Sequence, residues 1–384
     1  MLDLTRLVSR AGRVMTGVDR VEHAYLRALL DQQDPLFGLL RSSVGYLLLD
    51  RTGCSLLNDA LDQDQWAAPD WIGRLRKLPP GRAGAETMLR KASVARCLPH
   101  RLGPMLAKSL PAGTHYINVG HTNLTERMIT ALRQVPDLQI AVLIHDTIPL
   151  DFPEFQRPQI PDRFRGFLNR AATHADLLIC ISEHTRQSVS RHVPSMPATI
   201  VAHLGLGPLA PGPAPTGPWH EPYFVCLGTI EPRKNHQLLL DIWPEVPDAH
   251  LLICGARGWE NNDVFARLDA RPERVHELND LPDAQIHGLL QGATGLLFPS
   301  LAEGFGLPPV EAAALGTPVL CNDLPVYREI LGNIPVYASV TDGYAWVHEI
   351  KKMASANQDP AADSPPAFTA PDWATHFNKV LRHI

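Results

Sequence analysis

Two glutamates flank a Gly-Phe-Gly turn in the segment PSLAEGFGLPPVEAAALGTPVLCND, residues 299–323. Gly304 and Gly306 allow a ligand to approach the backbone closely, and the N–H groups beyond them can donate to sugar hydroxyls or phosphate oxygens. Glu303 can accept hydrogen bonds from those hydroxyls, and Glu311 can take two hydroxyls of a ribose. An ordinary capping turn would not need these carboxylates, so the segment predicts a site for a sugar joined to a nucleotide.

A second segment, LGTIEPRKNHQLLL at residues 227–240, is expected to run from a strand ending at Gly228 into a helix from about Lys234. Arg233 and Lys234 stand together at the start of that helix, where the helix dipole is already positive. Such a pocket favours an anion. A diphosphate leaving group fits it, because the planar Arg233 guanidinium and the Lys234 ammonium can both neutralise phosphate charge. The alternative is an exposed basic turn.

The segment IHDTIPLDFPEF places His145 and Asp146 just past an apolar strand of the N-terminal half. A histidine there can hold a sugar hydroxyl or can simply pack a loop. Asp146 is expected to orient the loop. In CISEHTRQSV, Ser182 is expected to cap the helix that follows the next strand.

Short apolar runs alternate with helix-like segments from about residue 115, and this alternation predicts parallel sheets with crossover helices. The Pro- and Gly-rich stretch LGLGPLAPGPAPTGPW interrupts the pattern and resembles a linker. We therefore expect an α/β chain with two doubly wound, Rossmann-like domains that face a cleft. The expected parts are an N-terminal domain (1–205), a linker (206–220), a C-terminal nucleotide-sugar domain (221–365) and a helix that crosses back (366–384).

The two C-terminal segments, in this order and spacing, resemble the family 4 retaining glycosyltransferases, whose E-x7-E signature and Arg-Lys pair are both present. The resemblance covers most of residues 114–384. It implies a GT-B fold, retention of anomeric configuration and no metal or other cofactor. It also implies that Arg233 and Lys234 bind the diphosphate, Glu303 the transferred sugar and Glu311 the ribose, and that His145 lies near that sugar. The implied donor-binding residues are Gly17, Gly228, Arg233, Lys234, Gly304, Phe305, Gly306, Leu307 and Glu311.

The resemblance extends more weakly to MTGVDRVEHAYLRALL at residues 15–30. Thr16 stands before Gly17 where the family often has a second glycine. Arg20 would face the cleft or would be a surface helix residue, and the sequence leaves both open. Arg20, Asn118 and His121 are the candidates for contact with the acceptor.

The net charge of −5 hides a basic stretch at residues 70–110, which carries nine Lys and Arg residues against Asp70 and Glu86. Such a stretch suits an anionic membrane surface or a lipid-linked phosphate better than nucleic acid, or it is a solvated helical face. No apolar run reaches membrane-spanning length and no secretory signal is evident, so we expect a cytoplasmic protein, with a possible peripheral place on the inner face of the membrane. The six scattered cysteines are expected to be reduced core residues.

From the bacterial polysaccharide members of the family we expect a mannose transfer from GDP-mannose to a lipid-linked saccharide, as in lipopolysaccharide synthesis. A UDP-hexose or dTDP-rhamnose is the alternative donor. The alternative to an enzyme is a catalytically silent subunit that only binds the nucleotide sugar. A metal-dependent GT-A enzyme would need an Asp-x-Asp motif after a strand. The one such triplet, Asp62 to Asp64, follows no clear strand. An epimerase or a phosphorylase could share the two-domain shape, but neither explains the E-x7-E segment as well.

Overall fold

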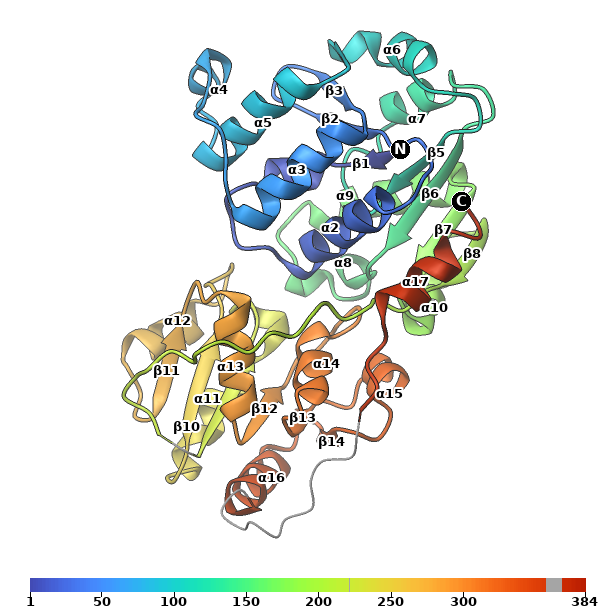
Figure 1. The fold of residues 1–384 in the computed structure, drawn as a ribbon. Coiled ribbons are helices and arrows are strands. Elements are labelled where there is room, and N and C mark those ends of the chain that lie inside the picture. Colours follow the sequence, from blue (N-terminus) through green and yellow to red (C-terminus); the bar gives the residue numbers. More distant parts are fainter. Residues whose placement is uncertain (221, 357–367) are drawn as a thin grey trace.

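The computed structural model describes residues 1–220, 222–356 and 368–384, which form two domains, each with a sheet between layers of helices (Figure 1). The strand order is β4-β3-β2-β1-β5-β6-β7-β8 in the N-terminal sheet and β11-β10-β9-β12-β13-β14 in the C-terminal sheet. The second sheet is entirely parallel. Two parallel-sheet domains are the architecture that the sequence predicts.

The strands are short and mostly buried, as expected where helices cover both faces of a sheet. The N-terminal strands are β1 (Leu2–Asp3), β2 (Gly38–Arg41), β3 (Tyr46–Leu49), β4 (Ala95–Cys97), β5 (His115–Asn118), β6 (Gln139–Ile144), β7 (Leu177–Cys180) and β8 (Ala198–Val201). The C-terminal strands are β9 (Tyr223–Leu227), β10 (His250–Cys254), β11 (Val275–Leu278), β12 (Gly295–Phe298), β13 (Val319–Cys321) and β14 (Val336–Tyr337).

The helices of the N-terminal domain are α1 (Thr5–Ser9), α2 (Gly17–Leu30), α3 (Arg51–Gln63), α4 (Trp71–Leu75), α5 (Pro80–Ala92), α6 (Leu102–Ser109), α7 (Glu126–Leu132), α8 (Ile148–Asp151), α9 (Ile160–His174) and α10 (Glu183–His192). Those of the C-terminal part are α11 (His236–Ile242), α12 (Asn262–Asp269), α13 (Asp283–Gly292), α14 (Leu307–Ala314), α15 (Pro325–Leu331), α16 (Gly343–Ala356) and α17 (Trp373–Val380). Short 3-10 turns occur at Pro99–Arg101, Pro153–Phe155, Pro232–Lys234 and Trp243–Glu245.

The sequence pattern recognised strands only from β5 onward, whereas the sheet begins with four earlier ones. β2 and β3 form an antiparallel hairpin, and β4 pairs antiparallel with β3. β1 pairs parallel with β2 but has only two residues, too few to show a strand pattern, and β2 to β4 form an antiparallel edge that a repeated parallel unit does not describe. Between β8 and β9, the described residues 202–220 form no helix or strand.

The last helix, α17, returns to the N-terminal domain, as the sequence predicts (Figure 1). The Asp372 side chain caps it by accepting a hydrogen bond from the Thr375 N–H at 2.8 Å. His376 lies 2.8 Å through Nε2 from the Tyr25 hydroxyl of α2 and 2.9 Å through Nδ1 from the His203 carbonyl. The crossing helix therefore supports α2, whose first turn borders the cleft described below.

Burial lowers the pKa of His376 from 6.5 to about 4. The unfolded chain takes up this proton below about pH 6.5 and the folded chain only near pH 4, so acid favours unfolding between these values. We expect this histidine alone to remove about 2 kcal/mol of unfolding free energy between pH 7 and pH 5.

Urea unfolding of the His376→Gln variant at both pH values measures this loss, because glutamine can make both hydrogen bonds without titrating. The variant should lose less stability in acid than the parent protein. His383→Gln is the control, since His383 is exposed. Equal losses of stability for the two variants would contradict the assignment.

Candidate active site

A cavity of about 600 Å³ lies between the two domains and is lined from both sides. In open parallel sheets, ligands bind at the carboxyl ends of the strands, and the loops that follow β9 and β12 border this cavity. All the predicted donor-binding residues line it: Gly17, Gly228, Arg233, Lys234, Gly304, Phe305, Gly306, Leu307 and Glu311. His145 lines it from the N-terminal domain.

An ion-pair cluster lines the cleft on the side of the C-terminal domain. The Glu303 carboxylate lies 2.7 Å from Lys234 Nζ and 2.7 Å from Arg233 Nη1. Arg233 also pairs with Glu231 at 2.8 Å. The Leu301 N–H donates to the Arg233 carbonyl at 2.9 Å, so backbone and side chains together join the two motifs.

Burial opposes ionisation of Glu303, but the Arg233 and Lys234 cations lower its pKa below the usual value. Burial also opposes the charged form of Arg233, and the carboxylates of Glu303 and Glu231 nevertheless raise its pKa. For Lys234 burial prevails and lowers the pKa. The cluster thus holds an ionised carboxylate beside a permanent cation, both removed from water.

Arg233 and Lys234 precede the helix rather than open it, which corrects the expectation of a helix from Lys234. They lie in the 3-10 turn Pro232–Lys234, and α11 begins only at His236. Asn235 lies between this turn and α11, and its left-handed backbone, φ 54°, separates the two helical segments. The two cations therefore sit on a separate turn that faces Glu303.

The Gly-Phe-Gly turn brings the two domains into contact. A Cβ atom on Gly304 would lie 2.3 Å from the His145 carbonyl oxygen, so only glycine fits there. Gly306 has φ 89° and precedes α14, which starts at Leu307 with prolines in its first turn. Phe305 is only 4% exposed and belongs to the core, so its backbone rather than its ring is available to a ligand.

His145 is held in one tautomer. Its Nε2 donates to the Val119 carbonyl at 2.8 Å, which leaves Nδ1 as an acceptor. Burial lowers its pKa to about 4, so the ring is neutral near pH 7. The His121 ring packs edge-on against it at 4.9 Å between centroids.

Arg20 and Glu311 meet across the cleft. Arg20 Nη1 lies 2.9 Å from Glu311 Oε1, and the second guanidinium nitrogen pairs with Asp283. Burial raises the pKa of Glu311, and Arg20 opposes that rise. Arg20 therefore faces the cleft, against the carboxylate assigned to the ribose, and its contact with the acceptor stays a prediction.

The other two predicted acceptor contacts, Asn118 and His121, are not among the residues that line the cavity. Asn118 is fully buried, and its amide donates to the Tyr116 hydroxyl at 3.0 Å and the Thr122 carbonyl at 2.7 Å. His121 Nε2 lies 2.9 Å from the Leu143 carbonyl. Both predictions are wrong, because these side chains satisfy backbone and core groups behind His145.

The sequence reading missed two arginines of the cleft. Arg6 and Arg10 line it and each lies 2.7 Å from a carboxylate oxygen of Asp19. Their spacing of four residues directly after β1 was the available signal. Asp62 of the Asp-x-Asp triplet lies in α3 and pairs with Arg27. Asp62 and Asp64 are not among the residues that line the cleft.

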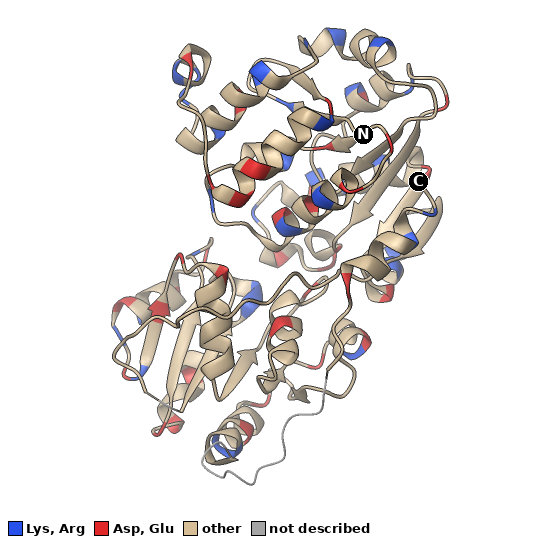
Figure 2. Cartoon of the chain, in the orientation of Figure 1, with Lys and Arg blue, Asp and Glu red and all other residues tan. Residues whose placement is uncertain are grey.

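Seven of the nine cations of the stretch 70–110 are exposed, and Figure 2 shows Lys and Arg side chains on the helices α4, α5 and α6 of the N-terminal domain. These seven are Arg74, Arg76, Lys77, Lys91, Arg96, Arg101 and Lys108. Four large apolar side chains are exposed in the same stretch, namely Trp71, Leu75, Val94 and Leu98. We call these eleven residues the basic-apolar rim.

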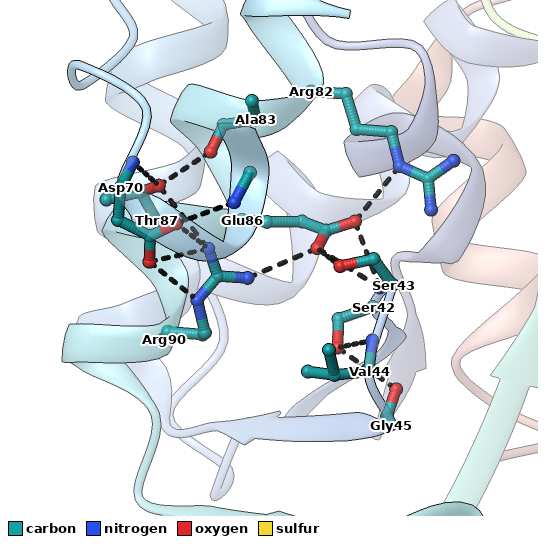
Figure 3. A network of polar contacts seen from close by, with 11 residues as sticks. Ser42, Ser43, Val44, Gly45, Asp70, Arg82, Ala83, Glu86, Thr87 and Arg90 are labelled. Carbon is teal, nitrogen blue, oxygen red and sulfur yellow. Dashed lines mark hydrogen bonds and ion pairs between the residues drawn. The ribbon is translucent and has the colours of Figure 1, made fainter. Parts of the chain in front are cut away.

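Of the remaining two cations of the stretch, Arg82 is half-buried and Arg90 is buried, and both point to Glu86 (Figure 3). The fully buried Glu86 carboxylate accepts from Arg82 at 3.0 Å and from Arg90 at 3.2 Å. Ser43 also donates to it, at 2.6 Å from its hydroxyl. Arg90 pairs in addition with Asp70 at 2.8 Å, and Asp70 caps α4. The network therefore fixes the short helix α4 that carries Trp71 and Leu75.

No described helix is both long and apolar enough to cross a membrane. The six cysteines are free, and five of them are buried.

The family model of glycosyl transferases group 1 matches residues 217–358. Over 241 residues the chain is 31% identical to the serotype-specific mannosyltransferase WbdA of Escherichia coli, covering 54% of this chain and 30% of WbdA. It is 28% identical over 225 residues to the O-antigen chain mannosyltransferase B of Escherichia coli, covering 52% of this chain and 56% of that protein. The matches thus span less than two thirds of these relatives.

Among solved structures, the chain is similar to Anabaena Alr3699/HepE in complex with UDP-glucose, with a TM-score of 0.68 at 15% identity. This likeness covers 100% of the chain and 98% of HepE, so it extends over both domains. Residues 217–358 thus match the model of the group 1 glycosyl transferases, and the whole chain has the two-domain GT-B fold.

Proposed function

We propose that the chain is a glycosyltransferase that moves a sugar from a nucleotide-sugar donor to a saccharide acceptor in bacterial surface polysaccharide synthesis. The observation that carries this proposal is the Glu303 carboxylate, held between Arg233 and Lys234 in a cleft that His145 borders from the other domain. The group 1 model and the mannosyltransferase relatives support the reaction class.

In this reaction the acceptor oxygen forms a bond to the anomeric carbon while the bond from that carbon to the diphosphate oxygen breaks. The nucleoside diphosphate leaves with the electron pair, and the acceptor hydroxyl proton passes to its phosphate oxygen. Arg233 and Lys234 stabilise the charge that develops on the diphosphate. Glu303 accepts hydrogen bonds from the sugar hydroxyls, and Glu311 takes the ribose.

His145 holds the sugar from the opposite side. Its neutral ring offers Nδ1 as an acceptor for a sugar hydroxyl, and its Nε2–H is already committed to the Val119 carbonyl. A neutral ring also avoids placing a third cation beside Arg233 and Lys234. The role of His145 is therefore positional, which fits a reaction driven by orientation and charge stabilisation.

GDP-mannose is the donor we favour, because the relatives are mannosyltransferases by name. A UDP-hexose is the second candidate, supported by the UDP-glucose complex of the structurally similar HepE. dTDP-rhamnose is a third. The non-enzymatic alternative is a catalytically silent binding subunit, which would bind the donor without turning it over.

The test of the activity is incubation with GDP-mannose, UDP-glucose and dTDP-rhamnose. We expect slow release of the nucleoside diphosphate from one donor and a loss of about 100-fold or more in Lys234→Ala, because the leaving group loses a buried cation. Lys352→Ala is the control, since that side chain is 69% exposed on α16. Tight donor binding without turnover would favour the silent subunit, and neither binding nor turnover would reject the proposal.

We also propose that transfer retains the anomeric configuration and requires no metal or other cofactor. The Arg233 and Lys234 cations supply the charge that a divalent ion would bring to the diphosphate. We expect an excess of EDTA to leave the rate unchanged, and NMR of the product to show the anomeric configuration of the donor. Inhibition that Mg²⁺ or Mn²⁺ reverses, or an inverted product, would contradict this part.

The acceptor is proposed to be a lipid-linked saccharide at the inner face of the cytoplasmic membrane, reached through the basic-apolar rim. Exposed cations are attracted to anionic lipids at about 1 kcal/mol each, and a tryptophan with aliphatic neighbours suits the interface. The Glu86 network supports this role, because a rigid α4 presents Trp71 and Leu75 without further ordering on contact (Figure 3).

Sedimentation with vesicles tests the rim. We expect the full chain to bind phosphatidylglycerol vesicles and the double variant Trp71→Ser with Leu75→Ser to bind them about tenfold more weakly, because two apolar side chains no longer enter the interface. Tyr344→Ser is the matched control, because Tyr344 is 79% exposed on α16 of the other domain. Equal binding to neutral phosphatidylcholine, or equal loss in the control, would reject the rim as the contact.

A further inference from the structure

A second cavity, of about 300 Å³, lies between the domains. The N-terminal domain lines it with α8, α10 and the loop before α8, and the C-terminal domain with residues 301–304 and 324–326. It shares Asp146, Glu303 and Gly304 with the larger cleft. The two cavities therefore adjoin at the end of the cleft where Glu303 lies.

This position matters for the proposed reaction. The oxygen that replaces the diphosphate must come to roughly 3 Å from the anomeric carbon of the sugar at Glu303. The large cleft contains Glu311 for the ribose, Arg233 and Lys234 for the diphosphate, and Glu303 for the sugar. Of these four residues, only Glu303 also lines the smaller cavity. A second sugar residue held there would lie beside the transferred one.

The lining has the chemistry of a carbohydrate site. Phe152 is half-buried, and its ring is stacked on Phe155 at 5.9 Å between centroids with an interplanar angle of 18°. The apolar C–H face of a hexose can pack on such a ring. Ser188, Arg191 and His184 offer polar groups for its hydroxyls.

The charges of the cavity are largely compensated. The Asp151 carboxylate lies 2.7 Å from His192 Nε2 and 3.5 Å from the Arg191 guanidinium, and Thr147 donates a hydroxyl hydrogen bond to it. Glu303 is paired with the Arg-Lys cluster. Compensated charges do not attract an ion strongly, so the lining favours a neutral polyhydroxyl ligand over a phosphate or a carboxylate.

We infer that this smaller cavity is the subsite for the terminal hexose of the saccharide acceptor, with Phe152 as its stacking platform and Arg191 and Ser188 as hydroxyl contacts. The inference rests on the proposed transferase function and replaces Asn118 and His121 as acceptor contacts. The bound hexose presents one hydroxyl toward Glu303, and that oxygen forms the new bond as the diphosphate leaves with the electron pair and the proton.

Saturation-transfer NMR with methyl α-mannoside tests the subsite on the full chain. The large cleft is first filled with the nucleoside diphosphate that most raises the melting temperature. We expect the mannoside to bind this complex, and Phe152→Ala to weaken the binding about tenfold through loss of the stacking face. Arg191→Ala should also weaken mannoside binding. Because the Arg191 side chain is 56% exposed, this second variant keeps the test valid if Phe152→Ala fails to fold.

The matched control is Arg186→Ala on the same helix, because Arg186 pairs with Glu183 and is not among the residues that line the cavity. It should bind the mannoside like the parent chain. No mannoside binding to the nucleotide-filled chain, or binding that both lining variants leave unchanged, overturns the subsite while the transferase proposal stands. If no nucleoside diphosphate binds at all, the transferase proposal itself fails.

Discussion

The buried Glu303 carboxylate and its two cations are the constraint on which the rest of the site depends. A carboxylate removed from water is costly unless partners surround it, and removing one partner leaves a buried charge. Its partners stand on the turn after β9, and Glu303 itself stands on the loop after β12. β9 and β12 are neighbours in the sheet, so the strand order brings together two motifs about 70 residues apart in sequence.

The domains meet around this cluster through close and polar contacts. The His145 carbonyl lies against Gly304, Arg20 reaches Glu311, and Glu329 of α15 accepts hydrogen bonds from the Glu183 N–H at 2.6 Å and the His184 N–H at 2.9 Å. Such contacts can be exchanged for ligand groups or water, as domain opening and closing require. Arg20 is a clear case, since a ribose that reaches Glu311 must share or displace it.

The donor side of the site could be predicted from sequence because each motif is local. The glycines, the prolines that start α14 and the adjacent cations are readable from neighbours in the chain. Arg20, by contrast, meets a carboxylate 291 positions away, and that pairing depends on how the two domains face each other. Asn118 was misjudged for a related reason: a polar residue after a strand can turn to the cleft or satisfy a buried carbonyl, and only the tertiary structure decides.

One group of buried charges in the N-terminal domain, around Glu86, lies away from the cleft. Glu86 is fully buried beneath the rim and is satisfied by Arg82, Arg90 and Ser43, so its contacts fix the geometry of α4 and the loop before β3. A hydrophobic core could have held that helix as firmly. Because charged side chains hold α4 in place, its apolar side chains Trp71 and Leu75 can face outward. Buried pairs of Glu with Arg or Lys thus shape the candidate donor site in one domain and support an exposed surface in the other. The number of charged residues in a segment therefore does not tell which of these two functions the segment has.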